Sequence, residues 1–291
     1  MNIISLGAGV QSSVMALMAA HGELPRPNCA IFADTQWEPQ GVYDHLDWLE
    51  SVVTNPLLAD TPFPVHRVTF GNIREDSVGT RRGINKNFRK GFPMLPYHVV
   101  NKDGSPGFGR RQCTVDYKIT PIRRKVREML GLKKRQRVPK NTFVEMNIGI
   151  STDEAVRMRP SHDKWIINRW PLIEKGMSRH DCLAWFEKNY PGRVLAKSAC
   201  VGCPYHNDAQ WREMKINDPE SFADAVDFDR KIRTANQKKA GLNGTLFLHA
   251  SRKPLDEVDF RNLEDKGQLN MFNNECEGMC GVWLIFQNSP S

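Results

Sequence analysis

The chain contains no stretch that approaches the roughly 20 consecutive apolar residues of a membrane-spanning helix. Its first residues also lack the basic segment and the small-residue cleavage site of a signal peptide. No internal repeat is present. These absences argue against a helical membrane protein, so we expect a cytoplasmic protein without a membrane partner.

The chain contains seven cysteines, which is an odd number. An odd number in a chain of 291 residues argues against a secreted disulfide framework and agrees better with reduced thiols or metal ligands. Cys29 lies in an apolar run and Cys182 in an apolar pattern with helical spacing, so we predict that both are packed structural residues. The other five are candidates for chemistry: Cys113, Cys200, Cys203, Cys276 and Cys280.

The charge is unbalanced, with a formal net charge of +8 and a pI of about 9.2. Lysine and arginine crowd into residues 80–90, 123–127 and 133–137, and such clusters attract phosphates. Candidates for an anion clamp are Arg81, Arg82, Arg110, Arg111 and Arg157. The aromatic side chains interleaved with the basic runs are few, namely Phe88, Phe92 and Tyr97. A non-catalytic nucleic-acid-binding module is therefore the least favoured class.

Apolar periodicity predicts alternating strands and helices in the first part of the chain. The expected strands cover residues 2–6, 28–33, 65–70 and 142–150, and the expected helices cover 11–21, a segment starting at Pro39, 178–189 and 219–238. The pattern weakens over 71–106, which is either a long functional loop or a small excursion. We predict a doubly wound, mainly parallel sheet in 1–170 and a mostly helical, cysteine-bearing region in 171–291, packed as one catalytic unit. Ligands of such sheets lie at the carboxyl ends of the strands.

The first strand-to-helix turn has the composition of a phosphate cradle. Gly7, Ala8 and Gly9 let backbone amides approach an anion, and two serine hydroxyls follow at the helix N-terminus. A dinucleotide fold would place a third glycine where Ser12 stands. A tight turn without a ligand is the remaining alternative.

Together with later segments, this turn resembles the phosphoadenosine phosphosulfate reductase family within the pyrophosphatase-loop adenine nucleotide hydrolases, over nearly the whole chain. Leu6-Gly-Ala-Gly-Val-Gln11-Ser is similar to the Ser-Phe-Gly-x-Gln loop of the sulfate-reducing members. Asp34-Thr-Gln-Trp-Glu38 resembles the family's Asp-Thr-Gly segment, in which the aspartate borders the nucleotide. The segment 149–157 is similar to Gly-Ile-Arg-x-Asp-Glu-Ser-x-x-Arg, with Ser151 in place of the first arginine.

The resemblance implies an adenine nucleotide as ligand, either ATP or phosphoadenosine phosphosulfate. The residues it assigns to the nucleotide are Gly7, Ala8, Gly9, Gln11, Ser12, Ser13, Asp34, Thr35, Gly149 and Arg157.

The cysteines extend the resemblance. Cys113, with Lys118 and Pro121, resembles the Cys-Cys-x-x-x-Lys-x-x-Pro segment of cluster-bearing adenylylsulfate reductases, with Gln112 in place of one paired cysteine. The resemblance implies a [4Fe-4S] cluster held by Cys113, Cys200 and Cys203, with Cys280 as the fourth metal ligand. A structural zinc ion held by the Cys-x-x-Cys pair and two other cysteines is the alternative.

Glu275-Cys276 resembles the terminal Glu-Cys-Gly segment whose cysteine attacks sulfur in the family's reductases. Cys276 is therefore the predicted catalytic thiol, although its role and that of Cys280 are interchangeable on the sequence alone. Two function classes follow. The first is a reductase-like enzyme acting on an adenylyl sulfate, and the alternative is an ATP-dependent sulfurtransferase that thiolates tRNA or DNA. The expected partners are a small anionic nucleotide, a nucleic-acid acceptor and a thiol or sulfur donor protein.

Overall fold

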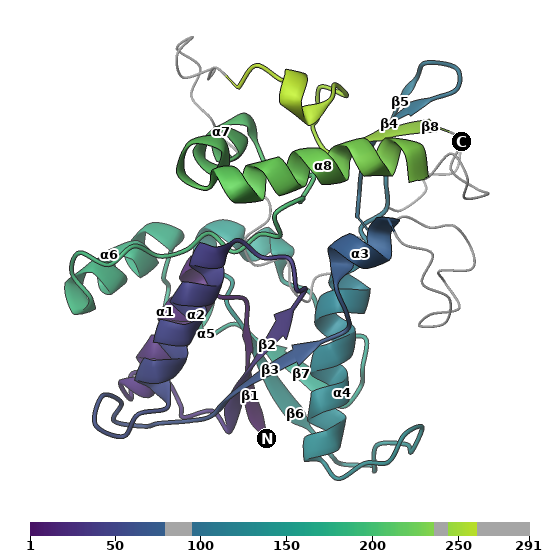
Figure 1. Ribbon diagram of the computed structural model, residues 1–291. Coiled ribbons are helices and arrows are strands. Elements are labelled where there is room, and N and C mark those ends of the chain that lie inside the picture. Colours follow the sequence, from purple (N-terminus) through teal and green to yellow (C-terminus); the bar gives the residue numbers. More distant parts are fainter. Residues whose placement is uncertain (79–94, 236–243, 261–291) are drawn as a thin grey trace.

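The computed structural model describes residues 1–78, 95–235 and 244–260 (Figure 1). The strands are β1 (Asn2–Leu6), β2 (Cys29–Asp34), β3 (Val65–Thr69), β4 (His98–Asn101), β5 (Pro106–Phe108), β6 (Val144–Ile148), β7 (Ile166–Arg169) and β8 (Gly244–Phe247). The α-helices are α1 (Val10–Ala20), α2 (Gln40–Val53), α3 (Ile73–Val78), α4 (Thr120–Met129), α5 (Pro171–Glu174), α6 (Arg179–Asn189), α7 (Asp208–Asn217) and α8 (Pro219–Ala235). A π-helical segment, η2 (Thr114–Ile119), and two 3₁₀ segments, η3 (Thr152–Arg157) and η5 (Leu255–Glu257), complete the elements. None of the helices in these ranges combines the length and the apolar character needed to span a bilayer.

A five-stranded sheet in the order β3-β2-β1-β6-β7 forms the centre, and every neighbouring pair in it is parallel. The predicted doubly wound α/β fold is therefore confirmed. The chain builds outward from β1 through β2 to β3 and then crosses to the other side of β1 to form β6 and β7. The strand order thus reverses between β1 and β6, and ligands of open α/β sheets bind at the carboxyl ends of the strands at such a reversal.

Helices cover the two faces of this sheet unequally (Figure 1). On one face lie α1, α2 and α6, and all eleven residues of α1 are buried because its small and apolar side chains allow contact on every side. On the other face, α4 packs through Ile122 and Val126 against β2 and β3. Cys29 and Cys182 lie fully buried in these two layers, as expected of structural cysteines.

A second layer lies beyond the carboxyl ends of the parallel strands. It contains α7, α8 and a three-stranded sheet in the order β5-β4-β8 (Figure 1). A second apolar cluster, which includes Trp37, Tyr97, Trp211 and Phe228, joins this layer to the end of β2. The strands β4 and β5 come from the first predicted range and β8 from the second, so both ranges contribute to this layer.

Candidate functional site

The loop after β1 is closed by its own hydrogen bonds. Gly7 N donates to Ser12 Oγ at 3.1 Å, Ser12 Oγ is 3.3 Å from Gly9 O, and Ser13 N donates to Gly9 O at 2.9 Å. Ala8 has a φ of 55°, a left-handed conformation that few non-glycine residues adopt. The loop, whose composition predicts an anion cradle, therefore has a fixed conformation where it leads into the N-terminus of α1.

Ser13 lies outside this cradle. Its side chain is fully buried, and its Oγ lies 2.9 Å from Nε2 of His45 on α2. Burial, together with the charge of Arg193, lowers the pKa of His45 to about 4, so the imidazole stays neutral at physiological pH. The structure thus gives the Ser13 side chain a place in the α1–α2 interface.

Gly149 packs directly against the residues that follow the loop after β1. It follows β6, and a Cβ atom added to it would lie 2.8 Å from Ser12 N, 2.9 Å from Ser12 Cα and 3.0 Å from Gln11 C. Only glycine allows two backbones to approach so closely. The end of β6 is therefore in direct contact with the first turn of α1.

A buried polar network occupies the reversal point between β1 and β6. Gln11 Nε2 donates to Ser151 Oγ at 3.3 Å and to Glu154 Oε2 at 3.2 Å. Arg157 Nη1 donates to Glu154 Oε1 at 2.5 Å. Gln11, Ser151 and Glu154 are all buried. The structure thus brings together Gln11 and Arg157, two residues assigned to the nucleotide from motifs far apart in the chain.

Burial raises the pKa of Glu154 to about 6, although the neighbouring Arg157 opposes the shift. The neutral carboxyl is thus favoured more in the folded chain than in the unfolded chain, where glutamate titrates near its ordinary value of 4.5. As the pH rises from about 4.5 to about 6, the unfolded state loses its proton first, and the folded state is progressively disfavoured. We predict that Glu154→Gln removes this loss, as a comparison of the melting temperatures of the two proteins across that window will show. Parallel pH profiles for the two proteins would contradict the assignment.

One cation of this network was not predicted from the sequence. Arg179, the first residue of α6, donates from Nη1 to Gln11 Oε1 at 3.2 Å and from its backbone N to Asp153 Oδ1 at 2.9 Å. Its charge lowers the pKa of Glu154, so it lies close to the carboxyl group. The Ser178-x-x-Asp181 capping box predicts the start of α6 but gives no sign that this start faces α1. Arg179 therefore supplies positive charge next to Ser151, the position at which the related motif has its first arginine.

We predict that Arg179→Met weakens adenine nucleotide binding about tenfold, because charge-assisted hydrogen bonds contribute about 1.5–3 kcal/mol. Arg67→Met is the matched control, since Arg67 is an exposed arginine of β3 paired with Asp47 and Glu50. Calorimetric titration with ATP measures both. Equal ATP affinities of the two variants would show that Arg179 does not contribute to nucleotide binding.

At the neighbouring strand end, Asp34 is held by two donors. Tyr43 Oη donates to Asp34 Oδ1 at 2.9 Å and Gln36 N donates to the same oxygen at 2.7 Å. Burial, with the hydrogen bond to Asp34, raises the pKa of Tyr43 far above its ordinary value, so the phenol remains a donor. The predicted nucleotide-bordering aspartate thus has a fixed orientation at the carboxyl end of β2.

Cys200 lies at this same strand end. Its Sγ is 3.3 Å from Thr35 Oγ1 and 3.4 Å from Glu38 Oε1, and Thr35 Oγ1 donates to the same carboxylate oxygen at 2.9 Å. Burial, followed by the negative charge of Glu38, raises the pKa of the Cys200 thiol well above its ordinary value. Glu38 is itself buried, and its second oxygen, Oε2, has no hydrogen-bond partner among the described residues.

The Cys-Val-Gly-Cys segment forms a tight turn against Trp37. Cys203 N donates to Cys200 O at 3.0 Å, and Val201 N donates to Trp37 O at 2.9 Å. A Cβ atom on Gly202 would lie 2.1 Å from Trp37 Cη2, so only glycine fits between the two cysteines there. Both thiols of the pair are therefore buried next to the segment that follows β2.

Cys113 approaches the pair from another part of the chain. It is half-buried and immediately precedes η2, and π-helical turns are frequent at functional sites. Its thiol contributes to the raised pKa of Cys200, whereas Lys118 of η2 lowers that pKa. Cys113, from a distant segment of the chain, thus lies near enough to Cys200 to influence its charge.

Four further predicted residues lie outside the described ranges, namely Cys276, Cys280, Arg81 and Arg82. Within the described ranges, no three His, Cys, Asp or Glu side chains are arranged to hold a single metal ion.

The described cysteines suit a [4Fe-4S] cluster in kind, because such a cluster takes about four thiolate ligands and Cys113, Cys200 and Cys203 are three side chains of that type, of which Cys200 and Cys203 are buried. A bound cationic centre would reverse the burial penalty on the thiolates, because a coordinating thiol is deprotonated by the metal.

A direct contact joins the cysteine segment to the phosphate loop. A Cβ atom on Gly9 would lie 3.6 Å from Ser198 Cβ and 4.0 Å from Ser198 N. Two residues later, Cys200 contacts Thr35 at the end of β2. The segment 198–203 therefore crosses the carboxyl ends of β1 and β2. The thiols and the loop thus lie at the same end of the parallel strands.

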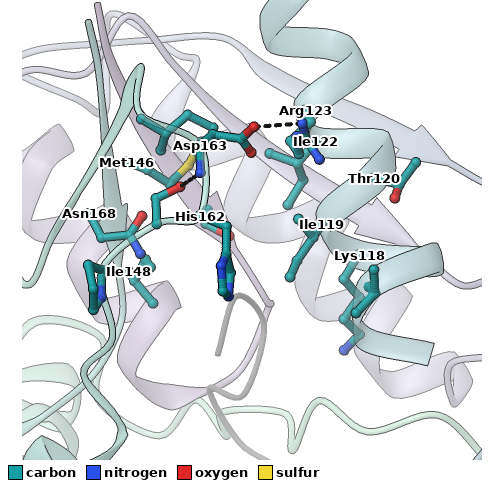
Figure 2. A pocket seen from close by; sticks show the side chains of 15 residues that line it. Lys118, Ile119, Thr120, Ile122, Arg123, Met146, Ile148, His162, Asp163 and Asn168 are labelled. Carbon is teal, nitrogen blue, oxygen red and sulfur yellow. Dashed lines mark hydrogen bonds and ion pairs between the residues drawn. The ribbon is translucent and has the colours of Figure 1, made fainter. Parts of the chain in front are cut away.

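A pocket of about 120 Å³ opens at the same edge, on the face of the sheet that α4 covers (Figure 2). Figure 2 shows the side chains of η2 and α4, from Lys118 to Arg123, opposite Met146 and Ile148 of β6. An ion pair of 2.6 Å between Arg123 and Asp163 closes one side. Lys118 lines this pocket, and its charge also lowers the pKa of the Cys200 thiol.

Comparison of the chain with protein-family models, with curated proteins and with solved structures finds no match in any of the three.

Proposed function

We propose that the protein binds an adenine nucleotide at the reversal point of the parallel sheet and performs sulfur chemistry on it with adjacent thiols. One observation carries the proposal: the segment of Cys200 and Cys203 lies against Gly9 of the phosphate loop and against Thr35 at the next strand end. A nucleotide bound at the loop would therefore have its reacting end beside the thiols.

The charges around this edge support an anionic ligand. Backbone amides of the loop and the N-terminus of α1 attract phosphate. Arg157 and Arg179 lie on one side of the reversal point, and Lys118 lies on the other. Arginine suits phosphate and sulfate because its fork donates two parallel hydrogen bonds. The pocket beneath Ile148 offers apolar walls for the adenosine half of such a nucleotide.

The first candidate reaction is reduction of an adenylyl sulfate, as the resemblance to the phosphoadenosine phosphosulfate reductase family implies. In this reaction the Cys276 thiolate attacks the sulfur, a sulfur–sulfur bond forms, and the sulfur–oxygen bond to the nucleotide breaks to release the nucleoside phosphate. A second thiol then attacks Cys276, and sulfite leaves as a disulfide forms. Cys113, Cys200, Cys203 and Cys280 would hold the cluster.

The experiment is turnover of phosphoadenosine phosphosulfate by anaerobically purified protein with a dithiol reductant. Cys276→Ser is expected to abolish sulfite release while nucleotide binding and iron content stay intact. Cys280→Ser is the matched variant and is expected to lower the iron content instead. Loss of iron only in Cys276→Ser would show that Cys276 is the cluster ligand and Cys280 the reactive thiol. Full activity in both variants would overturn the reductase mechanism.

A second candidate is ATP-dependent thiolation of a nucleic acid. An acceptor oxygen would attack the α-phosphorus of ATP and release pyrophosphate, and a sulfur nucleophile from a sulfur donor protein would then replace the adenylate and release AMP. The observation that favours this candidate is a group of aromatic and arginine side chains beside the Cys-x-x-Cys turn, formed by the exposed Phe108 and the half-buried Tyr205 and Arg111.

A further inference from the structure

A group of aromatic and arginine side chains borders the cysteine turn on the side of the second sheet. The Phe108 and Tyr205 rings meet edge to face with their centroids 5.6 Å apart, and the Arg111 guanidinium lies 5.0 Å from the Tyr205 centroid. Phe108 is 47% exposed, whereas Tyr205 and Arg111 are half-buried. We call Phe108, Tyr205 and Arg111 the aromatic platform.

The platform is tied to the thiols by short stretches of chain and by one hydrogen bond. Tyr205 stands two residues after Cys203, and Phe108 stands five residues before Cys113. His98 Nε2 lies 3.1 Å from Pro204 O, within the same turn, and the His98 ring packs on Phe108 with centroids 4.8 Å apart. The platform thus has a fixed position next to the candidate sulfur chemistry.

The exposure of Phe108 distinguishes it from the packed aromatic residues around it. Tyr97, which the sequence offered as a stacking residue beside the basic runs, is 1% exposed and belongs to the second apolar cluster. Tyr97 packs against Phe228 of α8. Phe88 and Phe92 lie outside the described residues. Phe108 instead leaves much of its ring open to a ligand.

We propose that the aromatic platform stacks an unpaired base of a single-stranded nucleic acid, whose adjacent nucleotide is the sulfur acceptor. The inference rests on the proposed nucleotide-dependent sulfur chemistry and names its acceptor. Aromatic faces accept any base, and an arginine adds a cation–π contact while its charge attracts the phosphate backbone. Arg110, next to Arg111, is exposed, and the whole chain carries a net charge of +8. These charges complement a nucleic acid.

The test is fluorescence anisotropy of a labelled single-stranded 12-nucleotide RNA or DNA titrated with the full chain. We expect wild-type binding that weakens with salt, and Phe108→Ala is expected to weaken it about tenfold, as loss of one stacked base does. Phe108→Tyr keeps an aromatic face and is expected to retain the affinity. Phe143→Ala is the matched control, because Phe143 is 53% exposed but lies just before β6. ATP affinity is measured for every protein and is expected to be unchanged.

Equal oligonucleotide affinities of Phe108→Ala and Phe143→Ala would overturn the platform, as would equal binding to a duplex of the same sequence. If Phe108→Ala does not fold, Arg111→Met provides the same comparison. ATP binding without any oligonucleotide binding would overturn the platform and leave the proposed nucleotide site standing. Platform-dependent oligonucleotide binding without ATP binding would support the platform and overturn the proposed function.

Discussion

Replacing Gly149 by alanine is expected to damage both the fold and the nucleotide site. The added Cβ would lie 2.8 Å from Ser12 N and 3.0 Å from Gln11 C, and these are backbone atoms that no side-chain rotation can move. Overpacking of this kind lowers the free energy of unfolding by about 1–3 kcal/mol. Because the clash falls on the first turn of α1, we also expect ATP affinity to fall about tenfold or more, which corresponds to about 1.4 kcal/mol.

Gly41→Ala is the control for this experiment. Gly41 lies in the first turn of α2, and a Cβ added there has no atom within 4 Å. Alanine in a helix is favoured over glycine by up to about 1 kcal/mol, so this variant is expected to be at least as stable as the wild type. Thermal unfolding and calorimetric ATP titration give the two readouts. A Gly149→Ala protein that matches Gly41→Ala in both would show that the end of β6 does not position the loop.

Replacing Cys200 by serine is expected to remove most of the iron and sulfide from anaerobically purified protein. The Cys200 thiol is held between Thr35 and Glu38 at the end of β2. Serine has nearly the same volume, so the fold can form, but it is a poor substitute for a thiolate ligand. Because bound metal stabilises the folded state, the melting temperature should fall together with the iron content.

Cys182→Ala separates this effect from the loss of any buried cysteine. Cys182 is fully buried on α6, and burial raises its pKa to about 12, so it remains a protonated, packed thiol. Iron and sulfide contents of this variant are expected to equal those of the wild type. The measurement is iron and sulfide analysis with an absorption spectrum. Full iron and sulfide in Cys200→Ser would overturn its role as a ligand, and an equal loss in both variants would show a general effect of packing.

β7 (Ile166–Arg169) was missed from the sequence, but the rest of the parallel sheet was predictable, because its strands contain short apolar runs and alternate with helical segments. The second sheet was not. Residues 98–101 show no clear alternation, and residues 106–108 contain proline and glycine, both of which are depleted in strands. β4 pairs with β5 and with β8, and its pairing with β8 joins segments more than 130 residues apart, which depends on tertiary packing that no local pattern reveals.

The candidate site likewise contains residues that the sequence predicted and residues that only the structure revealed. Gly9, Gln11 and Asp34 stand in local motifs at strand ends, so their position followed from the motif and the fold class. Arg179 and Glu38 reach the site only through tertiary contacts, with Gln11 in one case and with Cys200 in the other. Ser13 is the opposite case. It belongs to the local motif, but its side chain faces the core and contacts His45.

The most direct test of the shared nucleotide and thiol site is calorimetric titration of Gly9→Val with ATP, beside Gly9→Ala and the wild type. Gly9 has extended backbone angles, φ −97° and ψ −179°, and a Cβ there meets Ser198 only at 3.6 Å, so both variants should fold. The larger side chain projects between the phosphate loop and the cysteine segment. We predict ATP affinity at least tenfold weaker in Gly9→Val than in the wild type, with an intermediate value in Gly9→Ala. Unchanged affinity in a folded Gly9→Val protein would contradict the placement of the nucleotide.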